Sequence, residues 1–317
     1  MGVDGIRRVA VVGAGLMGHG IAQEFAVAGY DVRLCDRDEG RIGKARDDIR
    51  NNLAMLAGLG LITNDQASRS EERITPCTAL ADAAGDADLV IEAVFEDLDL
   101  KREIFRTLDG TCPFRTIFAS NTSSLLPGLL ASATRRPDRV LVAHYFNPPY
   151  LLPLVELVRH EGTSEETVRT MHALLTKIGK TPVVVQKEVP GFVGNRLQAA
   201  LFREALSIVG KGIATAEDVD TVVKNGFGRR LAGAGVFEIW EIAGWDLIQS
   251  VCENIFPDLE TSKDVPKLLK EMVGRGDLGT KSGKGFYSWT PESILALRKR
   301  IALVLSRIAR ELTPIRN

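Results

Sequence analysis

The chain has 317 residues, of which 45% are apolar, and a formal net charge of −1 at pH 7. A chain of this length can bury two separate cores, and its balanced charge gives it no strong electrostatic attraction to nucleic acid. Its four cysteines lie far apart without a CxxC pair, so the sequence indicates neither a metal site nor a disulfide framework and fits a reducing compartment. The N-terminus enters a strand without a cleavable signal, and no apolar run approaches the roughly 18 residues of a membrane span. We therefore expect a cytoplasmic protein that binds neither nucleic acid nor membrane.

The first half of the chain alternates between strand and helix patterns. A β-branched run at 7–15, a helical pattern at 17–30 and a second strand at 31–36 form a βαβ unit. A long helix is expected over 39–59, and further strands over 87–94, 115–120 and 139–146. After Val185 no alternating strand pattern is found, and the apolar residues recur at helical spacing. The pattern predicts an α/β fold with a Rossmann-type, doubly wound sheet over 1–188, followed by an all-α domain over 189–317.

The segment GAGLMG joins the first strand to the first helix. Gly13 makes the tight turn, Gly15 lets the backbone approach a pyrophosphate, and Gly18 lets helix pack on strand, with Leu16 and Met17 between them. Asp36 closes the second strand, where a carboxylate holds the two ribose hydroxyls of NAD and repels the 2′-phosphate of NADP. The alternative is a glycine turn in an ordinary α/β domain with Asp36 as a helix cap. His19, just inside the motif, is expected on the helix surface.

Two ionisable residues interrupt an apolar segment at 140–158. An antiparallel pairing of its two strands, with a loop centred on Pro149 and Tyr150, places His144 opposite Glu156. The carboxylate would fix the tautomer of the imidazole and raise its basicity, as in a general base. The alternative is a buried structural ion pair.

Polar residues flank this segment on both sides. Asn121, Thr122, Ser123 and Ser124 follow an expected strand at the end of the sheet where ligands bind. A helix N-cap is the alternative role for either serine. Asn195 lies in the first turn of the first helix of the second domain, where its amide caps a helix, bridges the domains or reaches a substrate oxygen.

With these motifs in order, the chain resembles the 3-hydroxyacyl-CoA dehydrogenase family from residue 7 to about 289. The resemblance rests on GAGLMG with Asp36, EAVFEDLDLK, SNTSS, HYFNPP with Glu156, PGFVGNRL and TKSGKGFY. It implies that His144 is the catalytic base and Glu156 its partner, and that Ser123 and Asn195 hold the reacting oxygen. It also implies that the cofactor, NAD, contacts further positions beside the glycines and Asp36, namely Glu96, Lys101, Asn121, Asn147 and Lys281. Solvated charges are the alternative for Lys101 and Lys281.

The resemblance implies reversible oxidation of the 3-hydroxyl of an L-3-hydroxyacyl-CoA. The helical region after the second strand departs from this pattern, because Leu59 and Leu61 stand where cations would meet the CoA phosphates. Arg46, Arg50, Arg69 or Arg73 could substitute. This region is similar to the lambda-crystallin and L-gulonate 3-dehydrogenase branch, which implies the same hydride transfer on a small free hydroxy acid. A non-catalytic NAD-binding protein is the third possibility. The presence of all four proposed catalytic residues, His144, Glu156, Ser123 and Asn195, argues against it.

The second domain is expected to pair with a copy of itself. Its helices at 196–210 and 236–256 are apolar over much of their circumference, which is more apolar surface than the helical domain can hide against one sheet domain. Family members pair through this domain, so the resemblance implies a homodimer. An amphipathic helix is expected in the tail, with an apolar stripe from Ile294 to Leu312 and basic residues up to Arg316, and we expect it to pack on its own domain or on the partner.

Overall fold

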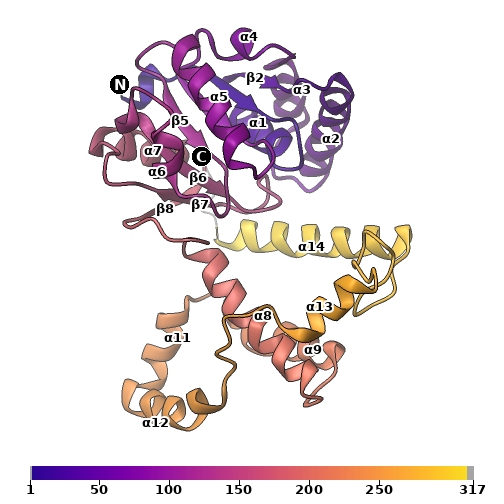
Figure 1. Cartoon of the computed structure of the whole chain (residues 1–317). Helices are drawn as coiled ribbons and strands as arrows, with labels where there is room; N and C mark the ends of the chain where they lie inside the picture. Colours follow the sequence, from indigo (N-terminus) through magenta and orange to yellow (C-terminus); the bar gives the residue numbers. More distant parts are fainter. Residues whose placement is uncertain (1, 313–317) are drawn as a thin grey trace. The chain divides into compact units, whose positions relative to one another are not determined.

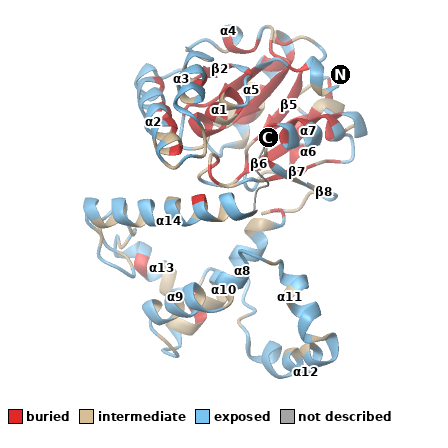
Figure 2. Ribbon diagram, turned by 180° about the vertical axis from the view of Figure 1, so that it is seen from behind, coloured by how far each residue is buried: buried red, intermediate tan, exposed pale blue. Residues whose placement is uncertain are grey.

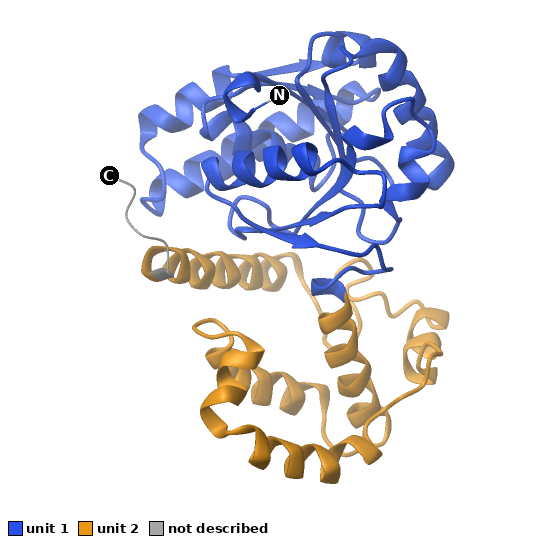
Figure 3. Cartoon of the chain, turned by 90° about the vertical axis from the view of Figure 1, so that its left-hand side faces the viewer, with its two compact units in different colours: residues 1–195 blue, residues 196–317 orange. Residues whose placement is uncertain are grey.

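The computed structural model describes residues 2–312 and divides into two compact units between Asn195 and Arg196 (Figure 3). Leu312 ends the last helix, but its side chain and Arg316 lie outside the described residues. The sequence predicted a boundary after Glu188, and the substrate-binding and dimerisation roles of the second domain stay predictions.

The first unit is built on one sheet of eight strands in the order β3-β2-β1-β4-β5-β6-β7-β8 (Figure 1). The first six strands in chain order are mutually parallel, β7 pairs antiparallel with β6, and β8 pairs parallel with β7. β4, β5 and β6 are buried along their whole length, as expected for strands covered on both faces. The strands are β1 Arg8–Val12, β2 Asp31–Cys35, β3 Ile74–Cys77, β4 Leu89–Glu92, β5 Ile117–Ser120, β6 Val140–Tyr145, β7 Leu154–Val158 and β8 Thr181–Val185.

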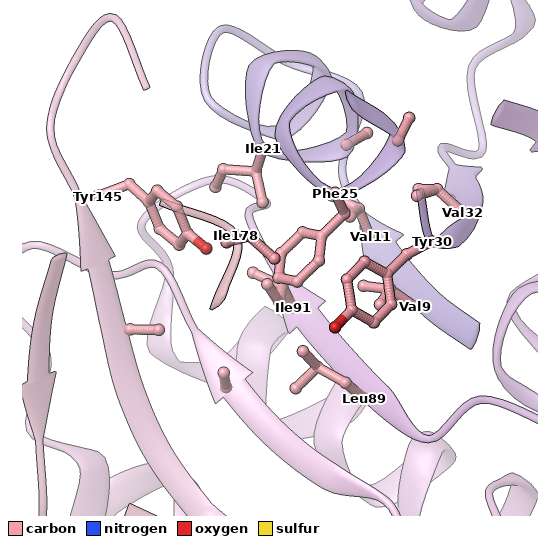
Figure 4. Close-up of a cluster of buried hydrophobic side chains, with 14 of the residues drawn as sticks. Val9, Val11, Ile21, Phe25, Tyr30, Val32, Leu89, Ile91, Tyr145 and Ile178 are labelled. Atoms are coloured by element: carbon pink, nitrogen blue, oxygen red, sulfur yellow. The ribbon is translucent and has the colours of Figure 1, made fainter. Parts of the chain in front are cut away.

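Helices cover both faces of this sheet and enclose two apolar clusters. On one face α1, α2 and α7 pack on a cluster in which Phe25 and Tyr30 meet edge to face at 5.8 Å (Figure 4). On the other face α4, α5 and α6 pack around Phe105 and Phe118. The doubly wound architecture is thus confirmed. The helices are α1 Gly18–Val27, α2 Glu39–Gly58, α3 Asn64–Glu72, α4 Leu80–Ala84, α5 Leu98–Thr111, α6 Pro127–Ala131 and α7 Glu165–Lys177.

Two strand pairings bear on the predictions from sequence. The antiparallel register of β6 and β7 places His144 opposite Glu156, so that prediction is confirmed. The short edge strand β3 had not been predicted, because it has only four residues and contains Pro76. Proline lacks an N–H donor and is tolerated at the edge of a sheet, where β3 lies.

The second unit is helical, as predicted, and no strand follows β8 in the described chain. Its helices are α8 Gly194–Gly210, which begins two residues before the division, then α9 Ala216–Asn225, α10 Phe227–Arg230, α11 Val236–Ala243, α12 Trp245–Ile255, α13 Lys267–Gly274 and α14 Pro291–Leu312. The long α14 is the expected tail helix. Among residues 2–312 no helix is long and apolar enough to cross a membrane.

The two units differ sharply in burial (Figure 2). In the part of the second unit that the structure describes, Leu206 and Met272 are the only buried apolar residues. Large apolar side chains stand exposed on its helices instead, among them Phe237 at 75% and Ile242 at 86%. A single copy of this unit therefore has almost no hydrophobic core of its own.

Candidate active site

The turn between β1 and α1 has the features of a pyrophosphate cradle. Gly13 adopts a φ of 104°, and a Cβ there would lie 2.5 Å from the carbonyl oxygen of Ala93. A Cβ on Gly18 would overlap the carbonyl oxygen of Gly13, so the helix approaches the strand as closely as glycine permits. Gly15 faces open space, with no atom within 4 Å of a Cβ built on it. Together with the N-terminus of α1, this backbone fits the diphosphate of a dinucleotide.

Three neighbours of the glycines complete this turn. Leu16 is 67% exposed and Met17 is half-buried. His19 is buried, and its Nδ1 lies 2.9 Å from the carbonyl oxygen of Gly15. The prediction that His19 lies on the helix surface is therefore wrong. The ring instead contacts the turn from inside, at the Gly15 carbonyl oxygen that also accepts the backbone N–H of His19 at 3.2 Å.

Asp36 follows β2 directly and faces the same turn. Its Oδ2 accepts a hydrogen bond from the Ala14 N–H at 3.0 Å, and its Oδ1 accepts one from the Asp38 N–H at 3.1 Å. Asp36 remains half-buried, while Asp38 provides the side-chain cap of α2. The carboxylate is thus fixed by two backbone N–H groups beside the glycine turn.

His144 and Glu156 form a buried hydrogen-bonded pair across β6 and β7. His144 Nδ1 lies 2.9 Å from Glu156 Oε2, and both residues are at most 5% exposed. The rings of Phe146 and Phe192 lie 4.6 Å and 5.6 Å from the imidazole. Because Nδ1 is engaged by the carboxylate, Nε2 is the nitrogen through which the ring can exchange a proton with another molecule.

The second oxygen of Glu156 binds the segment that leads into α8. Oε1 accepts hydrogen bonds from the N–H groups of Val193 and Gly194 at 2.9 and 2.8 Å. Phe192, which has a φ of 50°, turns the chain so that these two groups face the carboxylate. Burial acts to raise the pKa of Glu156, but the hydrogen bonds from His144, Gly194 and Val193 outweigh it and hold that pKa below its ordinary value. Glu156 is therefore ionised at neutral pH.

A loop of hydroxyl residues follows β5 and is organised by Glu96. Its Oε1 accepts hydrogen bonds from the Thr122 hydroxyl, from the N–H groups of Ser123 and Ser124, and from the Ser124 hydroxyl. Burial acts to raise the pKa of Glu96, and these hydrogen bonds together with the charge of Lys101 lower it overall. Ser123 itself is exposed.

Two asparagines connect this loop to the rest of the site. Asn121 Oδ1 accepts a hydrogen bond from the Tyr145 N–H at 2.9 Å, which joins the loop to β6 one residue after His144. Asn195 Nδ2 lies 3.5 Å from the carbonyl oxygen of Ser123. The first unit thus brings Ser123, His144 and Asn195 into one connected set.

Lys101 is buried beneath the same loop. It is 1% exposed, and its Nζ lies 2.7 Å from Glu92 Oε1 and 3.4 Å from Glu96 Oε2. The alternative of a solvated charge is wrong for this residue. Glu92, which is completely buried and also accepts from the Ser120 hydroxyl and the Val94 N–H, had not been singled out in the sequence. The signal was available, because a glutamate that ends an apolar strand needs a cation, and Lys101 follows in the next helix.

The remaining candidates lie apart from these contacts. Asn147 is exposed, lies two residues after the end of β6, and precedes Pro148 in a cis peptide bond. Lys281 belongs to the second unit, so its proximity to the cofactor stays a prediction. No group of three or more metal-ligating side chains occurs in the described part of the chain.

Two sequence models of one family match almost the whole chain. The 3-hydroxyacyl-CoA dehydrogenase NAD binding domain matches residues 8–189, and the C-terminal domain of the same family matches residues 191–289. A probable 3-hydroxybutyryl-CoA dehydrogenase of Bacillus subtilis is 40% identical over 90% of this chain and 98% of its own length. Lambda-crystallin of Oryctolagus cuniculus is 41% identical over 78% of this chain and 77% of its own length.

A solved structure agrees along almost the entire chain. It is that of a 5-formyl-3-hydroxy-2-methylpyridine 4-carboxylic acid 5-dehydrogenase, described as an NAD+ dependent dismutase. It superposes with a TM-score of 0.91 at 36% identity and covers 97% of this chain and 98% of that one.

The burial of Lys101 generates a stability prediction. Replacing Lys101 with Met leaves Glu92 without its cation in a fully buried position, so we expect a loss of about 3 kcal/mol in the free energy of unfolding. Urea unfolding followed by circular dichroism measures it. The double variant Lys101→Met with Glu92→Gln should recover part of the loss, because a neutral amide is less costly to bury than an unpaired carboxylate. Equal losses in the single and double variants would contradict the ion-pair interpretation.

Proposed function

The chain belongs to the 3-hydroxyacyl-CoA dehydrogenase family and is an NAD-dependent oxidoreductase acting on a CH–OH group, and from that premise we propose that His144 is the base of its redox reaction. The observation that carries this proposal is the buried hydrogen bond of 2.9 Å between His144 Nδ1 and Glu156 Oε2. Glu156 is already held by two backbone N–H groups, so it keeps the ring orientation and the tautomer that leaves Nε2 free to accept a proton.

The reaction then follows from these contacts. His144 Nε2 removes the proton of the substrate hydroxyl, and the ionised Glu156 stabilises the imidazolium that forms. NAD, when bound at the glycine turn, supplies the acceptor for the hydride that leaves the carbinol carbon. The hydroxyl of Ser123 and the amide of Asn195 hold the reacting oxygen. Such a positioned base contributes about 10²- to 10⁴-fold to the rate.

Other residues orient the cofactor or the loops around it. Asp36 holds the ribose diol, while the glycine turn, with Leu16 and Met17, holds the diphosphate. Glu96 and Lys101 fix the loop that carries Ser123 and so shape the wall of the cofactor site. Asn121, Asn147 and Lys281 complete the proposed contacts.

We propose an L-3-hydroxyacyl-CoA, oxidised reversibly to the 3-keto product, as the substrate. The family match over both domains supports this assignment, as does the 40% identity to the probable 3-hydroxybutyryl-CoA dehydrogenase of Bacillus subtilis. The proposed base acts on the 3-hydroxyl and does not depend on the CoA group.

A small free hydroxy acid is the second candidate, and a charge pattern on α2 and α3 favours it. Arg50 lies 2.7 Å from Glu71, Arg69 lies 3.1 Å from Asp65, and Arg73 lies 3.2 Å from Asp31. Three of the four arginines that could meet CoA phosphates are thus neutralised by acidic neighbours. A polyanionic CoA gains little from a surface of paired charges. The likeness to the pyridine-carboxylate dehydrogenase also supports this candidate.

We propose that the protein functions as a homodimer in the cytoplasm. The second unit lacks a core of its own and exposes Phe237, Ile242 and Trp245 on α11 and α12. About 120 residues cannot remain folded on two buried apolar side chains, so a second copy is the natural cover. Along α14, Ile301 and Val304 are 45% and 48% exposed, and this stripe extends the surface available to the partner. The four cysteines are free, which suits a reducing compartment.

The first prediction of the proposed function tests the base and the substrate together. NADH formation is measured with a panel of L-3-hydroxyacyl-CoA esters of different chain length and of free 3-hydroxy acids. We expect activity on the CoA esters. His144→Gln should lower the turnover on the preferred substrate at least about 100-fold while NADH affinity stays within about twofold, because the ring acts on the substrate. Activity on CoA esters alone would exclude the second candidate. Near-normal turnover by His144→Gln would exclude His144 as the base.

Glu156→Gln is the companion variant. The amide preserves much of the size of the carboxylate but cannot stabilise a protonated ring, so turnover should fall with little change in NADH affinity. Phe114→Leu, on an exposed side chain outside the site, is the control and should retain full turnover.

The second prediction concerns cofactor choice. NAD should bind at least about tenfold more tightly than NADP, because Asp36 accepts hydrogen bonds from the ribose hydroxyls and repels a 2′-phosphate. Fluorescence titration with NADH and NADPH measures the difference. Asp36→Ala should reduce the difference in affinity between NADH and NADPH. An unchanged ratio of the two dissociation constants would mean that Asp36 does not face the ribose.

The third prediction concerns assembly. Light scattering at micromolar concentration should give about twice the 34.5 kDa mass of one chain. Phe237→Asp should lower the dimer population, because it would bury a charge in an apolar contact. Phe114→Asp, on the first unit, is the matched control and should remain dimeric. A chain truncated after Trp289 tests the contribution of α14. A monomeric mass for the unmodified chain would refute the proposal.

A further inference from the structure

Two cysteines end adjacent parallel strands at the edge of the sheet. Cys35 is the last residue of β2, Cys77 is the last residue of β3, and the two are register partners. Register partners in neighbouring strands project their side chains to the same face, at a separation that a disulfide can bridge. Both thiols are free.

The Cys77 thiol is directed toward β2, since its sulfur lies 3.9 Å from the carbonyl oxygen of Leu34, the residue before Cys35. The interaction between the two thiols raises the pKa of Cys35 and lowers the pKa of Cys77. The charge of Arg33 also lowers the pKa of Cys77, while burial and the charge of Asp82 act in the opposite direction. Cys77 is therefore the thiol of the pair that more readily becomes the reactive thiolate.

The two thiols also differ in solvent exposure, and this difference again favours Cys77 as the reactive one. Cys77 is half-buried, whereas Cys35 is 3% exposed. A small oxidant can reach Cys77 first and leave Cys35 as the resolving thiol. Cys112 differs from both, because it is buried and burial raises its pKa to about 12.

The backbone of the two cysteines holds both the glycine turn and Asp36 by hydrogen bonds. The carbonyl oxygen of Cys35 accepts a hydrogen bond from the Gly13 N–H at 2.7 Å, at the start of the glycine turn. The carbonyl oxygen of Cys77 accepts one from the Asp36 N–H at 3.2 Å. Any change in the spacing of the two strand ends is thus passed directly to Gly13 and Asp36.

We propose that Cys35 and Cys77 are a peroxide-sensitive thiol pair whose disulfide weakens the binding of NAD. The Cys77 thiolate attacks hydrogen peroxide, giving a sulfenic acid and, after proton transfer, one water. The Cys35 sulfur then attacks the Cys77 sulfur and displaces a second water, so two thiols and one peroxide give one disulfide and two waters. The two sulfurs are drawn together to a bond of about 2.05 Å, and this movement shifts the strand ends that hold Gly13 and Asp36. Thiol reductants reverse the step.

The covalent step is tested by mass. The full-length protein is treated with hydrogen peroxide, blocked with an alkylating reagent and digested with trypsin. We expect a crosslink between the peptides 34–37 and 74–101, each of which contains one cysteine. Dithiothreitol should release the two peptides. Absence of this crosslink at peroxide concentrations that oxidise Cys77 to sulfenic acid, or its absence together with unreacted Cys77, would overturn the proposal.

The effect on the cofactor is tested by NADH titration of the same samples. Peroxide should raise the dissociation constant for NADH about tenfold, equivalent to about 1.4 kcal/mol, and dithiothreitol should restore it. Cys35→Ser and Cys77→Ser should each abolish the reversible change, whereas Cys112→Ser should retain it. A crosslinked protein with unchanged NADH affinity would equally overturn the proposal. Both readouts are independent of turnover, so they succeed or fail separately from the assignment of His144 as the base.

Discussion

The carboxylate of Glu156 is the group on which the rest of the site depends. One oxygen pairs with His144 from β6, and the other accepts the two N–H groups that lead into α8. A buried carboxylate with these partners is well satisfied, and its partners come from two segments that are distant in sequence. The same anion therefore fixes the imidazole tautomer and determines where α8 begins. The antiparallel hairpin of β6 and β7 is what delivers it, since the chain turns back after β6 and places Glu156 directly opposite His144.

Much of this arrangement could be predicted from local patterns. The glycine turn is defined within one βαβ unit, and the pairing of His144 with Glu156 follows from the period of two in a strand and the length of one hairpin. Asn195 was correctly assigned to the first turn of α8 because PGFVGN ends the extended segment before a long helical period. These features depend on residues that are near one another in sequence, where spacing alone limits the possible geometry.

The features that were missed depend on contacts distant in sequence. β3 is a short segment that pairs with β2 some 40 residues earlier, and Pro76 within it argues against a strand. The burial of His19 results from the way α1 packs on the sheet, although a polar residue in the first turn of a helix had been expected on the surface. In the sequence Lys101 resembles an ordinary helix-surface lysine. In the folded chain it is buried and pairs with the buried carboxylate of Glu92 at the end of β4. In each case tertiary packing overrode the local preference.

The carboxylates around the dinucleotide site accept hydrogen bonds mainly from backbone N–H groups and hydroxyl groups. Asp36 accepts from Ala14 and Asp38, Glu96 accepts from the loop after β5, and Glu92 is neutralised by Lys101. Because each anion is compensated locally, a ligand carrying two phosphates can approach the glycine turn without meeting a field of free carboxylates. The walls of the site are therefore built from carboxylates that are hydrogen-bonded within the first unit, and the glycine turn stays open at Gly15.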